Sequence, residues 1–222
     1  MSKRSRIEAL PGVWVDARRA LYLEALGALV IADIHWGYAQ SHRAVGNLLP
    51  IWGDEVIEQS LRALLADYAA KEMIWVGDSV HTAEGRHAAE NFLRDHAASV
   101  AITVLAGNHD RRWNRPQLKT LQRGNFFFHH GDDANVLSPE GAIEVIGHHH
   151  PAAGVHDGAG LRLKLPALVT SQKRMILPAF SPWAAGVDWR ERLLPEEKLW
   201  LLAPSRIFAV RAARANARLT SQ

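Results

Sequence analysis

The chain has 222 residues, of which 48% are hydrophobic and 22% are charged, and its formal net charge is +3. This composition excludes an extensively disordered chain, and the length is sufficient to bury the core of one domain. The absence of cysteine excludes disulfides, thiolate zinc sites and cysteine nucleophiles. The small positive charge does not require a nucleic-acid partner, and it does not repel a phosphate-bearing substrate.

The sequence favours a soluble, cytoplasmic protein. No apolar run approaches the roughly 20 residues that cross a bilayer. No apolar segment of the signal-peptide kind follows the basic amino-terminal residues. We expect a single domain over residues 1–222, with a basic tail at about residues 211–222.

The first half of the chain alternates apolar runs with segments of helical spacing. In chain order we expect a hairpin at residues 13–23, an apolar strand at 29–35, a loop at 36–49, a helix at 54–70, a strand at 73–76, a helix at 83–96 and a strand at 100–105. Strands and helices in alternation predict an α/β arrangement with parallel pairing.

The second half of the chain is richer in strands. Strand-like runs with short turns between them lie at residues 125–128, 143–146, 161–165, 174–177 and 206–210. Such a succession predicts a second sheet packed on the first rather than one all-parallel sheet. We therefore expect an α/β (α+β) fold with two packed sheets.

The strand at residues 29–35 ends in two side chains that bind metals, Asp33 and His35. Residues i and i+2 of a strand lie on the same face, so both side chains can point at one cation. This pattern alone is weak. It gains weight because three further apolar runs downstream end in the same kind of chemistry.

Carboxylates, an amide and imidazoles follow the later strands. The segments are Gly77-Asp78, Gly107-Asn108-His109-Asp110, His129-His130-Gly131 and Gly147-His148-His149-His150. Asp78 is a candidate bridging ligand, because each of its oxygens can hold a cation. An extended backbone would place His148 and His150 on one face and His149 on the other. This donor set suits two hard or borderline cations about 3.5–4 Å apart, which polarise a phosphate and activate a water.

The order of these motifs resembles the signature of the calcineurin-like metallophosphoesterases. Four segments resemble more closely the SbcD-related phosphoesterases, which include the DNA-ligase-associated group: Ala32-Asp33-Ile34-His35-Trp36-Gly37-Tyr38, Gly77-Asp78-x-x-His81, Gly147-His148-His149-His150-Pro151 and Leu177-Pro178-Ala179-Phe180. The resemblance extends from about residue 13 to about residue 210. It implies a four-layer metallophosphoesterase fold, in which two mixed β-sheets form a sandwich flanked by helices.

The resemblance also implies a ligand set. One metal would be held by Asp33, His35, Asp78 and His150, and the second by Asp78, Asn108, His130 and His148. A hydroxide held by the metals would attack phosphorus in line, while His109 protonates the leaving group or steadies the transition state. From the residues themselves we expect Asp110 to orient the His109 ring. Manganese is the favoured metal, and iron or zinc are alternatives.

Two histidine assignments stay open at this stage. His129 and His130 are adjacent, and only the family's His-Gly pair selects His130 as the ligand. His81 is expected near the pocket from its spacing to Asp78, and it either supports the metal ligands, contacts substrate or packs in the structure. Trp183 and Trp189 either line the pocket edge or pack in the core.

A basic stretch follows His109 directly. Arg111, Arg112, Arg115, Lys119 and Arg123 lie within thirteen residues that contain no acidic side chain. Such a stretch can bind the phosphates of a polyanionic substrate, with Trp113 available to stack on a base. The alternative interpretation is a solvated basic face. We take Arg111 and Arg112 as candidate substrate contacts.

We predict a two-metal phosphodiesterase that acts on nucleic acid or nucleotides, and the resemblance implies DNA repair with DNA ligase or helicase partners. One alternative is a phosphomonoesterase or pyrophosphatase that acts on a small metabolite. Another is a non-catalytic interaction module, which predicts gaps in the ligand set that this sequence lacks. SbcD-type nucleases continue into a capping and dimerising region, whereas this sequence ends at Gln222. We therefore expect a compact phosphoesterase rather than an enzyme of double-strand ends.

Overall fold

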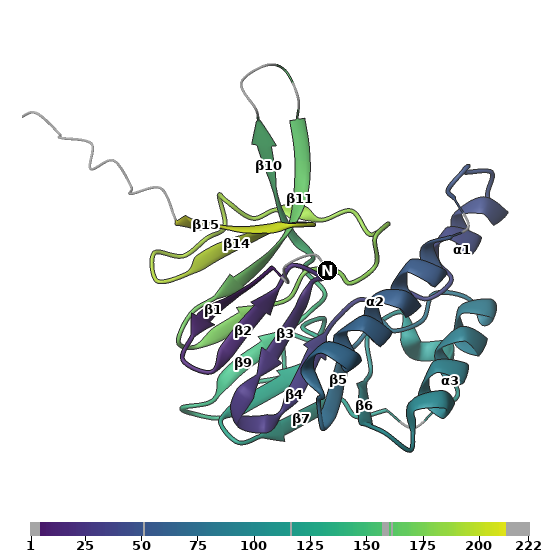
Figure 1. The fold of residues 1–222 in the computed structure, drawn as a ribbon, viewed down its shortest axis with the longest axis horizontal. Coiled ribbons are helices and arrows are strands. Elements are labelled where there is room, and N and C mark those ends of the chain that lie inside the picture. The colour runs from purple at the N-terminus through teal and green to yellow at the C-terminus, as the bar shows by residue number, and fades with distance from the viewer. Residues whose placement is uncertain (1–4, 51, 116, 157–159, 161, 212–222) are drawn as a thin grey trace, which may run out of the picture.

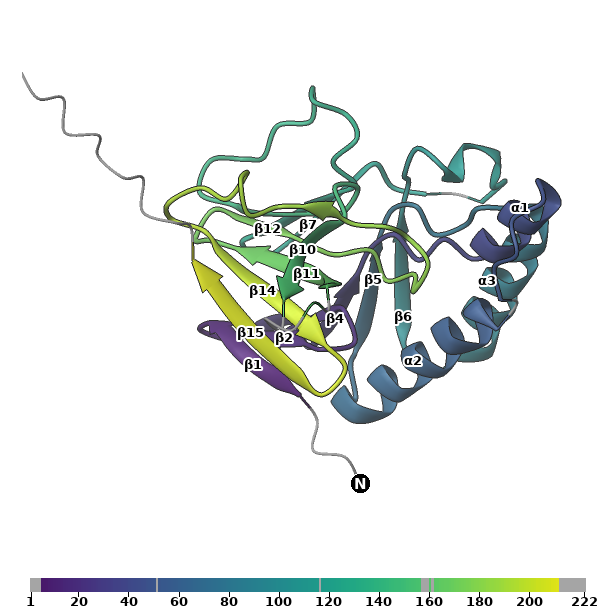
Figure 2. The ribbon, with the colours of Figure 1, turned by 90° about the horizontal axis from the view of Figure 1, so that it is seen from above.

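Two β-sheets packed face to face form the centre of the molecule, and the helices lie against the outer face of one of them (Figure 1, Figure 2). The computed structural model describes residues 5–50, 52–115, 117–156, 160 and 162–211. The first sheet has the strand order β1 (Arg6–Leu10), β2 (Val13–Asp16), β3 (Ala20–Leu23), β4 (Ala28–Ile31), β5 (Glu72–Val76) and β6 (Ala101–Leu105).

The second sheet has nine strands. Its main path runs β13 (Val187–Asp188), β10 (Pro151–His156), β11 (Arg162–Thr170), β12 (Arg174–Ile176), β9 (Ile143–Ile146), β8 (Phe126–His129) and β7 (Thr120–Arg123), while β14 (Lys198–Ala203) pairs with β11 and with β15 (Arg206–Arg211). The helices are α1 (Tyr38–Ala44), α2 (Gly53–Tyr68) and α3 (Ala83–His96), with short 3₁₀ helices η1 (Glu24–Leu26) and η2 (Asp110–Arg112). The predicted sandwich of two mixed sheets is confirmed.

Three hydrophobic clusters mark the layers of the fold. The first lies between the sheets and includes Ile74 and Phe128. The second packs the first sheet against the helices through Leu61 of α2 and Phe92 of α3. The third covers the outer face of the second sheet and includes Trp189. Burial of apolar surface on both faces of each sheet holds the strand ends in fixed positions.

Parallel pairing brings the carboxyl ends of several strands to one edge of the sandwich. In the first sheet β4, β5 and β6 are parallel neighbours, and in the second sheet β8 and β9 are parallel. A parallel bridge between Ala32 and Ala179 joins the two sheets there, and the Phe180 N–H donates to the Ala32 carbonyl at 2.8 Å. This edge carries the candidate ligands.

The sequence predicted the two long helices well. α3 has the expected bounds, and α2 begins and ends within two residues of them. Asp54 and Glu55 lie in the first turn of α2, where acidic side chains complement the helix dipole. The Thr82 hydroxyl accepts a hydrogen bond from the Gly85 N–H and caps α3.

Several elements differ from the expectation. Residues 36–49 were expected to be a loop, but they contain α1. Tertiary contacts anchor this helix, because the Gly37 N–H and the Gln40 amide both donate to the Asp54 carboxylate of α2. Strands β1, β7, β10, β13 and β14 were not predicted. The predicted basic tail lies outside the described residues, except for Arg211 at the end of β15. None of the described helices combines the length and hydropathy that a membrane crossing requires.

Candidate metal centre

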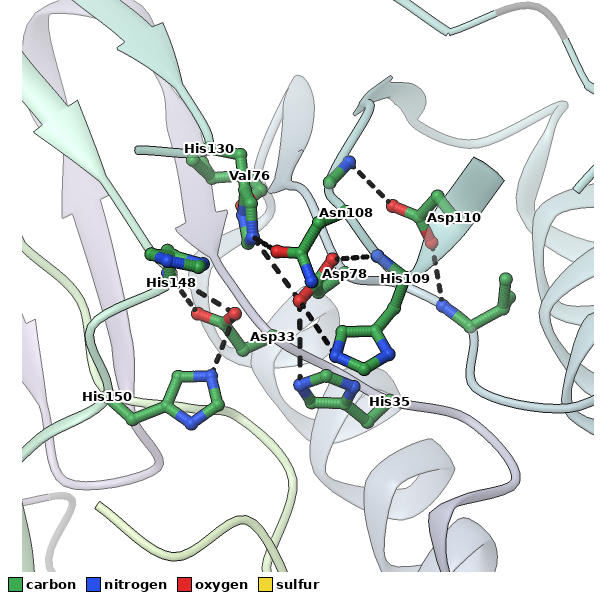
Figure 3. Close-up of polar contacts among 12 residues, drawn as sticks. Asp33, His35, Val76, Asp78, Asn108, His109, Asp110, His130, His148 and His150 are labelled. Atoms are coloured by element: carbon green, nitrogen blue, oxygen red, sulfur yellow. Dashed lines mark hydrogen bonds and ion pairs between the residues drawn. The ribbon is translucent and has the colours of Figure 1, made fainter. Parts of the chain in front are cut away.

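Five strand ends deliver imidazole, carboxylate and amide groups to one place (Figure 3). Asp33 and His35 follow β4, Asp78 follows β5, Asn108 and His109 follow β6, His130 follows β8, and His148 and His150 lie between β9 and β10. Asp33, His35, Asp78 and His130 are almost fully buried, each less than 4% exposed. Burial of so many ionisable groups is unfavourable unless they face one another or a ligand.

The backbone at these strand ends is left-handed rather than extended. The φ angles are +56° at Asp33, +50° at His35, +50° at Asp78, +62° at His148 and +45° at His150. Non-glycine residues adopt such angles at a cost and do so mainly at functional sites. The expected convergence of Asp33 and His35 is found, but the extended geometry from which we predicted it is wrong. His148 and His150 belong to different groups, and because both have positive φ, the extended backbone that would place them on one face is not found.

The first group of donors consists of Asp33, His35 and His150, whose ligand atoms lie within 4.8 Å of one another. The His150 Nε2 atom forms an ion-pair contact with Asp33 Oδ1 at 2.9 Å. The backbone N–H of His148 donates to Asp33 Oδ2 at 3.0 Å, which fixes the carboxylate. Ligand atoms this close together could hold a common cation.

The second group consists of Asp78, His130 and His148. The His130 Nε2 atom lies 3.3 Å from Asp78 Oδ2 and 3.3 Å from Asn108 Oδ1. The His130 Nδ1 atom is hydrogen-bonded to the Val76 carbonyl at 3.0 Å, which orients the ring. Asn108 therefore adds an oxygen donor to this group.

The carboxylate of Asp78 lies between the two groups. Its Oδ2 atom is 3.9 Å from His35 Nε2 on one side and 3.3 Å from His130 Nε2 on the other. Its Oδ1 atom accepts a hydrogen bond from the His109 backbone N–H at 2.9 Å. This position is the one that a shared ligand needs.

The adjacent histidines at the end of β8 have separate environments. The His130 ring lies in the second group, whereas His129 Nε2 is 2.9 Å from Glu144 Oε1 of the neighbouring strand β9. The His149 ring also lies apart from both groups, and its ring centroid is 5.5 Å from that of Trp189. The structure thus places His130, His148 and His150 in the site, and His129 and His149 beside it.

Charge coupling shapes the protonation of the site. Burial opposes ionisation of Asp78, but the hydrogen bond and charge of His130 outweigh it and lower the Asp78 pKa to about 2. Burial also opposes protonation of His130, but Asp78 and Asp33 outweigh it and raise the His130 pKa to about 9. Burial lowers the pKa of His35 to about 4. His35 therefore offers a free lone pair at neutral pH, whereas a cation at His130 must displace a proton.

The site fits divalent cations in its chemistry and its space. Carboxylate, amide and imidazole donors without thiolates suit manganese, iron or zinc. Glycines make room for the carboxylates, because a Cβ at Gly107 would lie 2.2 Å from Asp78 Oδ1 and one at Gly147 would lie 2.6 Å from Asp33 Oδ2. The described residues therefore have the donors, and the close backbone approach, that could hold a metal ion.

His109 and His81 lie at the rim of the site. The His109 side chain is 44% exposed, and its Nε2 atom is 4.0 Å from Asp78 Oδ2. Its ring stacks on His81 at 4.9 Å between centroids. Together with His35 these rings form a third set of closely spaced donor atoms. His109 can reach a substrate from solvent, and His81 restricts the orientation of its ring.

Asp110 does not contact the His109 ring in the way expected. Its buried carboxylate instead accepts hydrogen bonds from the backbone N–H groups of Val80 and Gly107, each at 3.0 Å (Figure 3). Burial raises the pKa of Asp110 to about 6. The side chain joins the loops after β5 and β6 and so positions Asp78 and Asn108.

The basic residues after His109 have two kinds of surroundings: some pair with acidic side chains, and others line a cavity. Arg115 pairs with Glu90 and Arg123 pairs with Glu72, so these two stabilise the fold. Arg111 and Lys119 line a cavity of about 540 Å³ that also includes His130. The Arg112 side chain lies outside the described part of the structure. Trp113 is buried and donates to Glu90 at 2.7 Å, so its suggested role as a base-stacking platform is wrong.

Sequence reasoning missed a second cavity next to His150. It has a volume of about 240 Å³, and its lining includes Arg19, Lys164 and Trp183. One local feature of the sequence could have drawn attention to Arg19, because this residue occupies the last position of the three-residue turn between β2 and β3. It has a φ of +67° there, where glycine is usual. Trp189, in contrast, is buried in the third hydrophobic cluster.

The two-sheet sandwich, with ligand-type residues at its strand ends, is a fold found in a nuclease of known structure. The structure matches the crystal structure of Pseudomonas putida nuclease MPE with a TM-score of 0.71 and 24% identity, over 94% of this chain and 100% of that chain. A fainter likeness, with a TM-score of 0.43 and 17% identity over 84% of this chain and 99% of that chain, is to YfcE, a phosphoesterase from E. coli. No protein-family profile and no curated protein matches the sequence.

Proposed function

We propose that this protein is a two-metal-dependent phosphodiesterase that acts on nucleic acid or nucleotides. The observation that supports this most is the meeting of two donor groups at one carboxylate oxygen, Oδ2 of Asp78. Bound divalent cations, with manganese favoured over iron or zinc, would neutralise phosphate oxygens and lower the pKa of a water. A phosphate ester is the substrate class that two adjacent cations bind and polarise best.

The side chains of the two donor groups have distinct roles in this proposal. Asp33, His35 and His150 would hold one cation, His130, His148 and Asn108 would hold the other, and Asp78 would serve both. Asn108 Oδ1, close to His130 Nε2, contributes an uncharged oxygen. The Val76 carbonyl and the His148 N–H keep an imidazole and a carboxylate in position before substrate arrives.

His109 is the residue that we place against the leaving group. Its Nε2 atom is at the rim, with nearly half of the side chain exposed, so it can hold a proton for the departing oxygen. His81 stacks on this ring and positions it. Asp110 positions the loop that carries Asn108 and His109 through its hydrogen bonds to Val80 and Gly107.

The finer assignment rests on the sequence motifs. The segments around His35, His81, His150 and Phe180 favour the SbcD-related, DNA-ligase-associated group, and with it a DNA-repair role, ligase or helicase partners and a cytoplasmic site of action. The nuclease named for the P. putida structure supports nucleic acid as the substrate class. Arg111 beside His130 supplies a cation for a substrate phosphate. We assign residues 1–222 to one domain.

Hydrolysis of bis-p-nitrophenyl phosphate and of p-nitrophenyl phosphate, measured in manganese, tests the proposal. We expect cleavage of the diester by the native protein and none by Asp78→Asn. The exposed Asp95 on α3 supplies the matched control, since Asp95→Asn removes the same charge away from the site. Cleavage of the monoester alone would contradict the phosphodiesterase assignment, and metal binding without cleavage of either ester would contradict the enzymatic one.

A further inference from the structure

The cavity beside His150 has a cationic lining. Among the described residues that line it are the cationic side chains of Arg19 and Lys164, and none is an aspartate or glutamate. The cavity beside His130 differs, because Arg111 and Lys119 share its lining with Asp132 and Asp133. A cavity lined with cations and no carboxylates is a favourable place for an anion.

Arg19 is held in place without a carboxylate partner in the described structure. Its Nη1 atom donates to the carbonyls of Phe180 at 3.2 Å and Ser181 at 2.6 Å. Burial lowers the pKa of Arg19, and no acidic group counters this effect. Within the described residues Nε and Nη2 make no hydrogen bond. The neighbouring Arg18 is the opposite case, because it pairs with both Asp16 and Asp67.

The backbone at Arg19 and the wall of the cavity are both preformed. An arginine with a φ of +67° is strained relative to glycine, and the hydrogen bonds to Phe180 and Ser181 hold the side chain in place. Trp183 forms a wall that packs tightly on α2, since a Cβ at Gly53 would lie 2.0 Å from its Nε1 atom. The exposed Lys164 donates to the Gly186 carbonyl at the same cavity.

We propose that this cavity binds a second phosphate group of the substrate, next to the phosphate that reacts at the metal centre. The inference rests on the proposed function and deepens it. His150 belongs to the first donor group and also lines the cavity, so the two sites are separated by a single side chain. The Arg19 guanidinium presents a planar pair of donors to phosphate oxygens, and Lys164 adds a point charge.

Paired substrates test this proposal through a ratio of rates. Thymidine 5′-(p-nitrophenyl phosphate) carries one phosphate, and its 3′-phosphorylated analogue carries two. With manganese we expect the native protein to favour the second by roughly tenfold or more in kcat/KM, the effect of charge-assisted hydrogen bonds. Arg19→Gln and Lys164→Gln should each lower this ratio, whereas Lys173→Gln, an exposed lysine away from the cavity, should preserve it. Equal losses on both substrates would overturn the proposal.

A binding measurement separates this inference from the proposed function. Titration of the native protein, with and without manganese, compares thymidine 3′,5′-bisphosphate and thymidine 5′-diphosphate with thymidine 5′-monophosphate. Tighter binding of the bisphosphate that Arg19→Gln abolishes assigns the cavity to a phosphodiester chain, and tighter binding of the diphosphate assigns it to a nucleotide pyrophosphate. Equal affinity for all three overturns the inference even if diesters are cleaved. Failure to cleave any ester contradicts only the proposed function.

Discussion

The Oδ2 atom of Asp78 and the Nε2 atom of His130 lie 3.3 Å apart in the middle of the candidate site. On its other side the same oxygen faces His35 Nε2 at 3.9 Å. One carboxylate therefore serves two sets of imidazoles, and the site cannot be divided into independent halves.

Replacement of Asp78 by asparagine should remove both cations at once. The substitution takes a negative charge from each donor group while it keeps the shape of the side chain. We expect metal analysis of the purified protein to fall from about two equivalents to well below one, and turnover to fall by about 10²-fold or more. Full metal occupancy in Asp78→Asn would show that Asp78 is not shared.

Replacement of His109 by alanine should separate catalysis from metal binding. The His109 ring lies at the rim and is 4.0 Å from Asp78 Oδ2, so its loss leaves both donor groups in place. We expect metal content to stay at the native level and kcat to fall by roughly 10²-fold. His87→Ala, an exposed histidine on α3, is the matched control. Parallel loss of metal and rate would contradict the separate role of His109.

Insertion of a single methyl group at Gly107 should disrupt the shared ligand. A Cβ there would lie 2.2 Å from Asp78 Oδ1 and 2.3 Å from the Asp78 backbone nitrogen, so the Asp78 loop must move. We expect Gly107→Ala to lower the affinity for manganese by at least roughly tenfold, measured by titration calorimetry. Gly154→Ala is the control, because its nearest contact would be Arg190 Nη2 at 3.6 Å. A normal affinity in Gly107→Ala would show that the loop adapts.

The Glu144–His129 contact should make stability depend on pH. The hydrogen bond from His129 outweighs burial and holds the pKa of Glu144 below its ordinary value of 4.5, with help from Ser138 and Arg174. A folded-state pKa below the unfolded value stabilises the fold above the unfolded pKa, and this contribution disappears as the pH falls through the folded pKa. By the linkage relation, the free energy of unfolding of the native protein should exceed that of Glu144→Gln by its largest amount near pH 7. This difference should decrease below pH 4.5. Urea unfolding across this range measures it, and a constant difference would contradict the assignment.

Much of the fold could be predicted from the sequence because its long elements follow simple periods. The apolar positions Ile57, Leu61 and Leu64 define α2, and they are all buried against the first sheet. Helix α1 could not be predicted from apolar spacing, because its one buried residue is Ala39. The helix depends instead on the contacts of Gly37 and Gln40 with Asp54 of α2. Strand β10 begins with proline and small residues, which have low strand propensity. It is a strand because it pairs with β11 and β13.

The residues of the candidate site were predicted better than their geometry. Asp33, His35 and Asp78 lie together as expected, but they do so through left-handed backbone angles that no residue pattern reveals. The hydrogen bonds of Asp110 to Val80 and Gly107 span thirty residues of sequence in one case, and the burial of Trp113 depends on Glu90 of α3. Arg19 was missed for the same reason, since its partners at Phe180 and Ser181 lie across the sandwich.

The left-handed backbone at the strand ends limits which substitutions can stabilise this protein without loss of the candidate site. Seven non-glycine residues in the described chain have positive φ, and five of them are candidate ligands, so backbone strain is concentrated where the chemistry is. At about 1 kcal/mol or more per residue, a library selected for heat resistance alone would favour glycine or asparagine at these five positions and would lose the ligands. Thermostable variants that keep the site must draw their gains from the three cores and the surface.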